Sequence, residues 1–464
     1  MRLCHTAPVT AARFDEPNLV SAAGLVPVMR LAADAGLGEL AGTLLTVPTD
    51  KGANPGGKVT ALVCGMVAGA DSIDDMTLLR HGAMGRLFDR TYAPSTLGSF
   101  LRECRFGHVR QLDAVASRFL TALAARTPLL AGDLSDLVLV DIDDSIIEVH
   151  GYAKQGASFG YTRVRGLNML LATASTRSSA PVVVAQRLRK GSCGSPRGAK
   201  RLVADALKTV RSLRGGPVLL RADSAFYGSP TIGAAVRAGA QVSVTVRMTP
   251  NIKAAIASIS DDAWTAIEYT DAIRDENTGE LISRAEVAEV PFTAFASASK
   301  TEQVPGRLVV RRIPDFNAPA NPGQASLFEL WRFHALFTTT KPEVLDTIAA
   351  DKTHRGHAII EQVHADLKNS ALAHMPSGKF MANSAWLALA VMAFNLTRAA
   401  GTLAGGRFSR ATTGTIRRTL ISVPARVSSS ARRLTLHLPQ GWPWETQWTE
   451  LLTRTSSPPA ATTA

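Results

Sequence analysis

The sequence predicts an α/β protein: a mixed sheet with flanking helices is interrupted by a β-rich insertion and lies between an all-helical N-terminal domain and a helical, basic C-terminal region. Three observations predict this class. Apolar residues recur at helical spacing from about residue 18 to 126. At Leu137 the pattern changes to short β-rich runs around one amphipathic helix. A second strand-rich stretch then precedes two further helical segments.

Length and charge narrow the possible functions. The length of 464 residues suggests about three domains, or one large core carrying appendages. The composition, 46% hydrophobic and 19% charged, is typical of a folded globular protein and excludes a wholly disordered or fibrous chain. Lysine and arginine total 51 against 38 acidic residues, and the net charge of +13 indicates a polyanionic partner, with nucleic acid ahead of an acidic membrane surface. The four cysteines show neither disulfide nor zinc-finger spacing, which favours a reducing compartment.

No segment predicts export or membrane insertion. The first 17 residues contain no apolar run of the length of a secretory signal. The longest apolar runs, residues 61–70 and 385–394, are short of the ~20 residues that a membrane span needs, so we expect two buried core helices. We therefore expect a cytoplasmic protein without membrane contact, associated with the nucleoid if its partner is DNA.

Changes in pattern divide the chain into five expected segments. They are a helical DNA-binding domain (1–130), the first part of the α/β core (131–228), a β-rich insertion (229–342), the second part of the core (343–404) and a basic C-terminal tail with a disordered end (405–464).

The expected elements follow in chain order. Helices of the first segment are expected at 18–37, 58–70, 96–104 and 109–126. Strands of the core are expected at 137–142, 168–176, 180–188 and 216–224, with a helix at 198–214. The insertion is expected to hold a helix near 251–259 and strands at 285–292, 307–313 and 330–339 around a Pro/Asn/Gly-rich loop at 313–324. Helices are then expected at 343–370 and 382–401, before a tail with eight arginines against two glutamates.

Three aspartates follow the apolar run that begins at Leu137. In an extended strand Asp141 and Asp143 point to the same face, and Asp144 points elsewhere or lies in a turn with Ser145. Buried carboxylates are costly without a compensating cation, so two on one face at a strand end suggest a cation site. The alternative interpretation is an ordinary polar strand end.

A second carboxylate, Asp223, follows the apolar part of the strand predicted at 216–224. Open α/β sheets place their ligands at this edge, although Asp223 would equally serve as the cap of a helix beginning near Ser229. The adjacent Phe226 and Tyr227 are interpreted as core residues in preference to a surface on which a nucleotide base stacks.

A histidine-rich helix surrounds Glu361. At 100° per residue one stripe of this helix holds His354, His357, Glu361, His364 and Lys368. The opposite side holds Ile360, Val363 and Leu367, so we expect this side to pack and the stripe to face a functional partner. A solvated face and a zinc site of three histidines are alternatives, but the pattern is not HExxH.

Basic residues concentrate between the two aspartate sites. Residues 187–221 contain ten lysines and arginines against Asp205 alone, a balance of +9 that would suit a phosphate backbone. From this run we expect DNA contacts by Arg187, Arg189, Lys190 and Arg221. No GxxxxGK[ST] or GxGxxG loop is present, so an ATP-driven enzyme is not expected.

A carboxylate of the first strand, Asp223 and Glu361 would together form a site for two Mg²⁺ ions, with Mn²⁺ as a substitute. Two such ions, roughly 3.5–4 Å apart, activate a water or 3′-hydroxyl and stabilise the leaving oxygen in an in-line attack on a phosphodiester. Without metal, like charges this close would drive at least one carboxyl group toward protonation.

These motifs, in this order, resemble the DDE transposases of the IS4 superfamily, and among them the IS1380 family. The resemblance covers roughly residues 55–401 and rests on DIDDS, LLRADSAFY, the HxxHxxxExxxxxxK helix and FMANSAWLALAVMAFNLTR. It implies an RNase H-like catalytic core interrupted by the β-rich insertion. It also implies that the catalytic and metal-binding triad is Asp143, Asp223 and Glu361.

The sequence departs from the family in two places. The family helix usually reads Y-x2-R-x3-E-x6-K, and here His354 replaces the tyrosine and His357 the arginine, whereas Glu361 and Lys368 match. Ser145 replaces the usual threonine of the first motif. The resemblance implies DNA contacts by Lys368, His357 and His354, and those made by histidine would be weaker and pH-dependent because histidine loses its charge near neutral pH.

The implied function is Mg²⁺-dependent transposition. Such an enzyme binds the terminal inverted repeats of its insertion sequence as a homodimer, cleaves there and joins the freed 3′ ends to target DNA. The alternative is a transposase-derived DNA-binding repressor without cleavage activity. A DxD glycosyl or nucleotidyl transferase would use Asp141 and Asp143 but leaves the helix stripe without a role. Trp442, Trp444 and Trp448 are either core or a docking patch, for example at a dimer contact.

Overall fold

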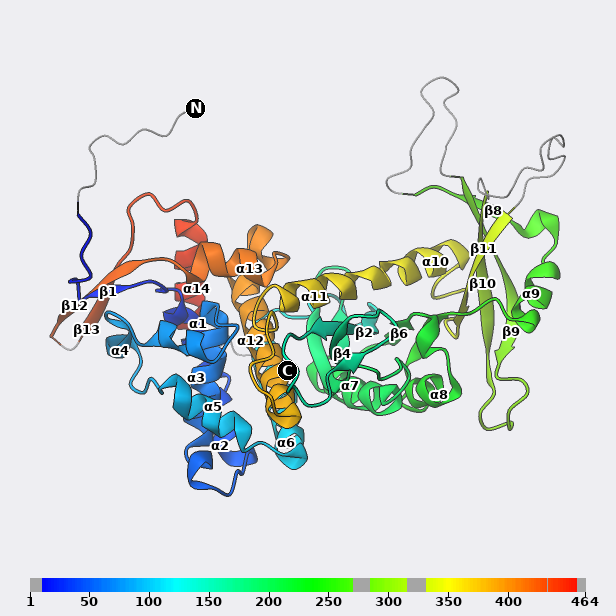
Figure 1. The fold of residues 1–464 in the computed structure, drawn as a ribbon. Coiled ribbons are helices and arrows are strands. Elements are labelled where there is room, and N and C mark those ends of the chain that lie inside the picture. The colour runs from blue at the N-terminus through cyan, green and yellow to red at the C-terminus, as the bar shows by residue number, and fades with distance from the viewer. Residues whose placement is uncertain (1–10, 270–283, 315–330, 432, 457–464) are drawn as a thin grey trace.

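The computed structural model describes residues 11–269, 284–314, 331–431 and 433–456. The molecule is elongated, with helices at one end, a mixed sheet in the middle and long antiparallel strands at the other end (Figure 1). The predicted mixed α/β class, with a mixed sheet and many helices, is confirmed.

The first part of the chain is helical, as predicted. Each helix buries an apolar stripe, and α3 is buried along nearly its whole length after a start at Pro55, where the Asn54 side chain accepts a hydrogen bond from the Gly57 N–H. The helices are α1 (Leu25–Asp34), α2 (Leu37–Leu44), α3 (Pro55–Ala68), α4 (Met84–Leu87), α5 (Pro94–Arg102) and α6 (Phe106–Ala124). The expected helix at 18–37 is wrong at its start, because Leu19–Val20 form a short strand, β1.

Within the described residues, the central sheet has ten strands. They are β2 (Val138–Glu148), β3 (Ser158–Phe159), β4 (Arg165–Ser175), β5 (Val182–Lys190), β6 (Val218–Ala222), β7 (Gln241–Thr245), β8 (Thr265–Ile267), β9 (Ala285–Ala294), β10 (Val304–Pro314) and β11 (Trp331–Thr338). The order is β3-β4-β2-β6-β7-β11-β10-β9-β8, and β5 also pairs with β4, along Leu167–Ala174. Strands β2, β6 and β7 are parallel, whereas β4, β5 and β11 run antiparallel to their neighbours. The strands of the predicted insertion therefore extend this sheet, and most of the loop expected at 313–324 lies outside the described residues.

Helices cover both faces of the sheet. One face packs on α7 (Ala199–Leu213) and α8 (Ser229–Arg237), where Val140 and Ile142 of β2 join a buried cluster with Leu202. The other face is crossed by α10 (Thr347–Arg355) and α11 (Ile359–Lys368) (Figure 1). Helix α9 (Pro250–Ala257) lies beside β9.

Helix α12 (Phe380–Ala404) joins the helical end to the sheet. It packs against α3, α6 and β5, and as predicted it is a buried core helix. By length and composition it would suffice to cross a membrane, but 94% of its most apolar stretch is buried inside the protein.

The C-terminal segment is not a helical tail. It folds back onto the first helices as α13 (Thr413–Ile416), β12 (Ala425–Ser430), β13 (Arg433–His437) and α14 (Glu445–Ser456). Strand β12 pairs with both β1 and β13, and α14 packs on α1 and α12. Trp448 is buried, and Trp442 Nε1 donates to the Thr419 carbonyl at 3.1 Å, so these two members of the tryptophan group serve packing. The expected disordered end lies, from residue 457 on, outside the described residues.

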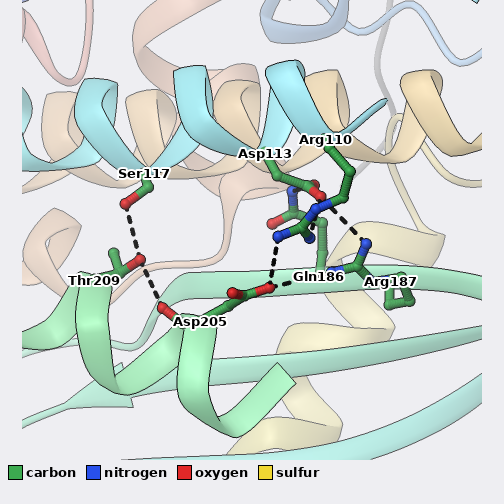
Figure 2. A network of polar contacts seen from close by, with 7 residues as sticks. All are labelled: Arg110, Asp113, Ser117, Gln186, Arg187, Asp205 and Thr209. Atoms are coloured by element: carbon green, nitrogen blue, oxygen red, sulfur yellow. Dashed lines mark hydrogen bonds and ion pairs between the residues drawn. The ribbon is translucent and has the colours of Figure 1, made fainter. Parts of the chain in front are cut away.

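A polar network attaches α6 to the sheet and α7. Arg110 of α6 and Arg187 of β5 each contact the carboxylates of Asp113 and Asp205, at 2.9–3.4 Å (Figure 2). The Gln186 amide donates to Asp113 at 2.8 Å, and the hydroxyls of Ser117 and Thr209 bond across the same seam. These pairs fix the position of the helical end relative to the sheet.

The seam predicts a pH-dependent stability. Burial raises the pKa of Asp113 to about 6 although two arginines lower it. Because the folded-state pKa lies above the unfolded value, the charged carboxylate destabilises the fold above pH 6, and this cost disappears as the pH falls toward 4. From pH 7 to pH 5 the wild type should therefore gain about 1 kcal/mol of unfolding free energy relative to Asp113→Asn. Urea denaturation of both proteins at both pH values measures this difference. If the unfolding free energies of wild type and Asp113→Asn change by the same amount between the two pH values, the prediction is wrong.

Candidate active site

Strand β2 carries the first group of aspartates in its middle. It continues to Glu148 and pairs with β4 along that length, so the strand end predicted near Asp144 is wrong. Because strand side chains alternate, Asp141 and Asp143 share the face covered by α11, and Asp144 points to the opposite face, as predicted. The strand tolerates these carboxylates because arginines neutralise two of them.

Asp141 forms a buried ion pair. The Arg221 guanidinium, directly opposite on β6, donates to both carboxylate oxygens at 2.7 Å, and the Asp141 side chain is 1% exposed. His357 Nδ1 lies 3.0 Å from the same carboxylate. Arg221 also donates to the Thr353 carbonyl, and a Cβ at residue 356 would lie 2.9 Å from its Nη1, which explains the glycine there. The Asp141–Arg221 pair therefore links β2 to β6, and through Arg221 to α10.

Asp144 is neutralised in the same way on the other face. Arg189 Nη2 lies 2.9 Å from its carboxylate, and the Asn168 amide donates to it. Arg189 further donates to the carbonyls of Gly194, Ser195 and Arg197, which anchors the loop after β5.

Asp143 and Asp223 are the aspartates without such partners. Asp143 accepts from the Asp144 N–H at 2.7 Å, and Asp223 accepts from the Ala225 N–H at 3.0 Å. In the part of the chain that the structure describes, neither forms an ion pair with a lysine or arginine. Burial, together with the charges of Asp223 and Asp144, raises the pKa of Asp143 to about 6, and loss of water around its carboxyl group raises the pKa of Asp223.

Asp223 lies at the carboxyl end of β6, as predicted. It caps the short 3₁₀ turn Ser224–Phe226 and not α8, whose N-cap is Gly228. Phe226 is 1% exposed and the Tyr227 ring packs 5.2 Å from Phe295, so the core interpretation of this aromatic pair is confirmed.

The predicted helix stripe faces strands β2 and β7. The single helix predicted here is divided by a 3₁₀ turn at Gly356–Ala358 between α10 and α11. Lys368 Nζ donates to Ser145 Oγ at 2.6 Å, and His364 Nδ1 lies 3.7 Å from the Asp143 carboxylate. Ile360, Val363 and Leu367 are buried on the packing side, as predicted.

Glu361 is the exposed member of this stripe. It lies one turn from His357 and one turn from His364, the histidines that approach Asp141 and Asp143. Within the described ranges, no three His, Cys, Asp or Glu side chains are grouped closely enough to hold a metal ion. Asp143 and Asp223 are thus close enough for the charge of Asp223 to act on Asp143, whereas among the described residues no contact joins Glu361 to either aspartate.

Two of the histidines are neutral. His354 bonds through both ring nitrogens, to Ser243 and Thr245 of β7, and burial lowers its pKa to about 3. Burial, together with the charge of Lys368, lowers the pKa of His364 to about 3. Because the stripe's histidines face different partners, the zinc alternative loses its geometric basis.

Several predicted DNA contacts need correction. Arg189 and Arg221 are 7% and 2% exposed and are paired with aspartates, so the prediction that they contact phosphate is wrong. Arg187 belongs to the seam of Figure 2, and His354 is engaged by hydroxyl groups. Lys190 is exposed, and Lys368 and His357 lie on the active-site face of the sheet.

The donor set suits a hard divalent cation. Asp143 and Asp223 are two carboxylates with raised pKa and, among the described residues, no lysine or arginine partner. Such oxygen ligands without charge compensation are the environment that Mg²⁺ and Mn²⁺ prefer. Asp141 and Asp144, by contrast, have no such deficit of positive charge.

A comparison with protein families assigns the chain. The model described as transposase DDE domain, group 1, matches residues 2–459. The chain belongs to this family of DDE transposases. A search of curated proteins found no match.

Among solved structures, the cryo-EM structure of a piggyBac transposase synaptic complex with hairpin DNA is similar over 94% of this DDE transposase and 80% of that chain. The TM-score is 0.38 and the sequence identity 9%, and nothing about this chain's site follows from so distant a likeness.

Proposed function

We propose that the chain is a metal-dependent DNA transposase of the IS4 superfamily, with motifs closest to the IS1380 family, and that Asp143, Asp223 and Glu361 are its catalytic triad. The observation that carries the proposal is the contrast among four neighbouring aspartates. Asp141 and Asp144 are each paired with an arginine, whereas in the described part of the chain Asp143 and Asp223 have no such partner. This pattern leaves two carboxylates for a cation.

The sheet supports an RNase H-like core. Strands β5, β4 and β2 are antiparallel neighbours, and β6 and β7 continue in parallel from β2, in the spatial order β5-β4-β2-β6-β7. Asp143 lies on β2, the central strand of this arrangement, and Asp223 directly follows the neighbouring strand β6. A carboxylate-bearing helix, α11, crosses the same face.

In this proposal each residue has a separate task. Asp143, Asp223 and Glu361 would hold Mg²⁺, or Mn²⁺ in its place. Bound divalent ions activate the attacking hydroxyl and stabilise the leaving oxygen of a phosphodiester. Lys368, held by Ser145, would place its ammonium group against a phosphate, and His357 would add a second donor. Glu361 would turn toward the aspartates when DNA and metal bind, because its exposed side chain is free of buried packing.

The DNA partners would be the terminal inverted repeats and the target. The net charge of +13 supports binding to a polyanion, and the pairing of two DNA ends favours a homodimer on DNA, in the cytoplasm at the nucleoid. The specific alternative is a repressor that binds the repeats without cutting. The unpaired aspartates favour the enzyme, because a pure binder has no need of an uncompensated carboxylate pair.

An excision assay tests the function. The DNA that flanks the gene is placed around a marker on a plasmid, and wild type is compared in cells with Asp143→Asn, Asp223→Asn and Glu361→Gln. We expect excision by the wild type alone, because each substitution removes one proposed metal ligand while keeping the side-chain volume. Immunoblots control for protein level, and gel shifts with the same DNA control for binding. Binding without excision by any protein would favour the repressor.

A further inference from the structure

The connection between β2 and β4 exposes aromatic side chains beside the active site. Tyr152, Phe159 and Tyr161 are 100%, 64% and 80% exposed. Aromatic residues normally bury their rings, and exposed ones gathered in a short segment are typical of a binding surface. Residues 150–165 are rich in glycine, aromatic and basic residues.

The segment is held in place. The Arg165 guanidinium donates to the carbonyls of Gly151 and Tyr152, at 2.8 and 3.2 Å. Lys154 Nζ donates to the Met375 carbonyl, and the Gln155 N–H donates to the Gly378 carbonyl at 2.9 Å. The exposed rings therefore project from anchored backbone, which reduces the entropy lost when a ligand binds.

A cavity of about 600 Å³ separates this segment from the end of α11. Its walls include Ser145, Lys154, Tyr161, Lys368 and His374. The volume lies within the ~300–1,000 Å³ of typical ligand sites. The lining combines the Tyr161 ring with two lysines and one carboxylate, Glu148, and this aromatic and net positive lining matches a nucleotide, with its flat base and anionic phosphate.

The cavity adjoins the proposed catalytic carboxylates. Ser145, in its wall, is two residues from Asp143 on the same face of β2 and holds Lys368 at 2.6 Å. Burial raises the pKa of Tyr161, and the negative charges of Asp144, Asp143 and Asp223 raise it further. The cavity therefore begins two residues along β2 from Asp143, on the same face of the strand.

We propose that the cavity receives a nucleotide adjoining the scissile phosphate, with the ring of Tyr161 stacked on its base and the Lys368 ammonium group facing its phosphate. This assignment rests on the proposed function and adds a positioning residue to it. Tyr161 acts by holding the strand so that its phosphate stays against the carboxylates. Stacking needs the aromatic ring and not the hydroxyl group. Tyr161→Phe should therefore keep the stacking, and Tyr161→Ala should lose it.

Fluorescence of 2-aminopurine tests the stacking directly. The probe is a duplex of the DNA flanking the gene, with 2-aminopurine next to the cleavage position, bound to full-length protein carrying Asp223→Asn so that no cutting occurs. We expect Tyr161 to quench the probe, Tyr161→Phe to retain the quenching, and Tyr161→Ala to lose it and weaken binding about tenfold. Tyr152→Ala is the matched control, because Tyr152 is exposed in the same segment but does not line the cavity.

The outcomes separate the two proposals. Binding by all variants with fluorescence that does not depend on residue 161 overturns the role of Tyr161 and leaves the transposase intact. If Tyr152→Ala and Tyr161→Ala lose the fluorescence quenching to the same extent, the role of Tyr161 is also overturned, because the whole segment, and not one ring in the cavity, would then cause the quenching. A gel shift with the same probe shows first whether the protein binds this DNA, and its failure counts against the proposed function itself.

Discussion

Asp143→Asn is expected to stop DNA cleavage without weakening the fold. The Asp143 carboxylate is 23% exposed and has no lysine or arginine partner among the described residues. Its pKa, raised to about 6 by burial and by neighbouring carboxylates, indicates that its charge is unfavourable in the folded protein without metal. Asparagine keeps the shape and removes this charge, so the thermal midpoint of the metal-free protein should stay level or rise.

The loss of cleavage should be large. A divalent ion contributes several kcal/mol of transition-state stabilisation, and ~1.4 kcal/mol corresponds to a factor of ten in rate. Removing one of its ligands should lower the cleavage rate by roughly a thousandfold or more, measured on labelled DNA ends under single-turnover conditions. Asp34→Asn, at an exposed position of α1, is the control. If the thermal midpoint of the Asp143→Asn protein is instead several degrees lower than that of the wild type, Asp143 has a structural role like that of Asp141.

The α/β core was predictable because its signals are local. The runs at 137–142, 168–176 and 180–188 consist mainly of apolar and β-branched residues, and each became a buried strand. The amphipathic repeat at 198–214 became α7. The side of α11 that packs also follows from its 3.6-residue period, since Ile360, Val363 and Leu367 are all buried.

The tertiary partners of charged residues were not predictable in this way. The aspartates after Leu139 were interpreted as the end of a strand, yet β2 passes through them because Arg221 stands directly opposite Asp141 in the β2–β6 register. The positive balance of residues 187–221 includes Arg189 and Arg221 as if they were free to bind phosphate. A count along the chain does not show that each has a buried carboxylate partner.

The C-terminal segment shows the same limit. Strand β12 pairs with β1, and Leu19 lies opposite Arg426, about 400 residues later in the chain. Neither strand carries enough apolar alternation to be recognised alone, because a two-residue strand such as β1 has no period. Its strand character depends on a partner from the other end of the sequence.

Arg221→Met is expected to destabilise the protein by about 3–5 kcal/mol. The substitution leaves the Asp141 carboxylate, 1% exposed, without its guanidinium partner, and an uncompensated buried charge is the most costly outcome of breaking an ion pair. It also removes the hydrogen bond from β6 to the Thr353 carbonyl of α10. Chemical denaturation measures the loss, and a shift below ~1 kcal/mol would show that His357 alone compensates Asp141.

The double variant Asp141→Leu with Arg221→Met gives the sharper comparison. When both charges are replaced by apolar groups, no buried charge remains, so the double variant should be more stable than either single variant. Additive losses in the double variant would mean that the two side chains act independently, contrary to their 2.7 Å contacts. Because Asp143 and Asp223 keep their carboxylates in all three proteins, recovery of stability should be accompanied by recovery of cleavage. A stable but inactive double variant would instead show that the Asp141–Arg221 pair also positions His357 for DNA.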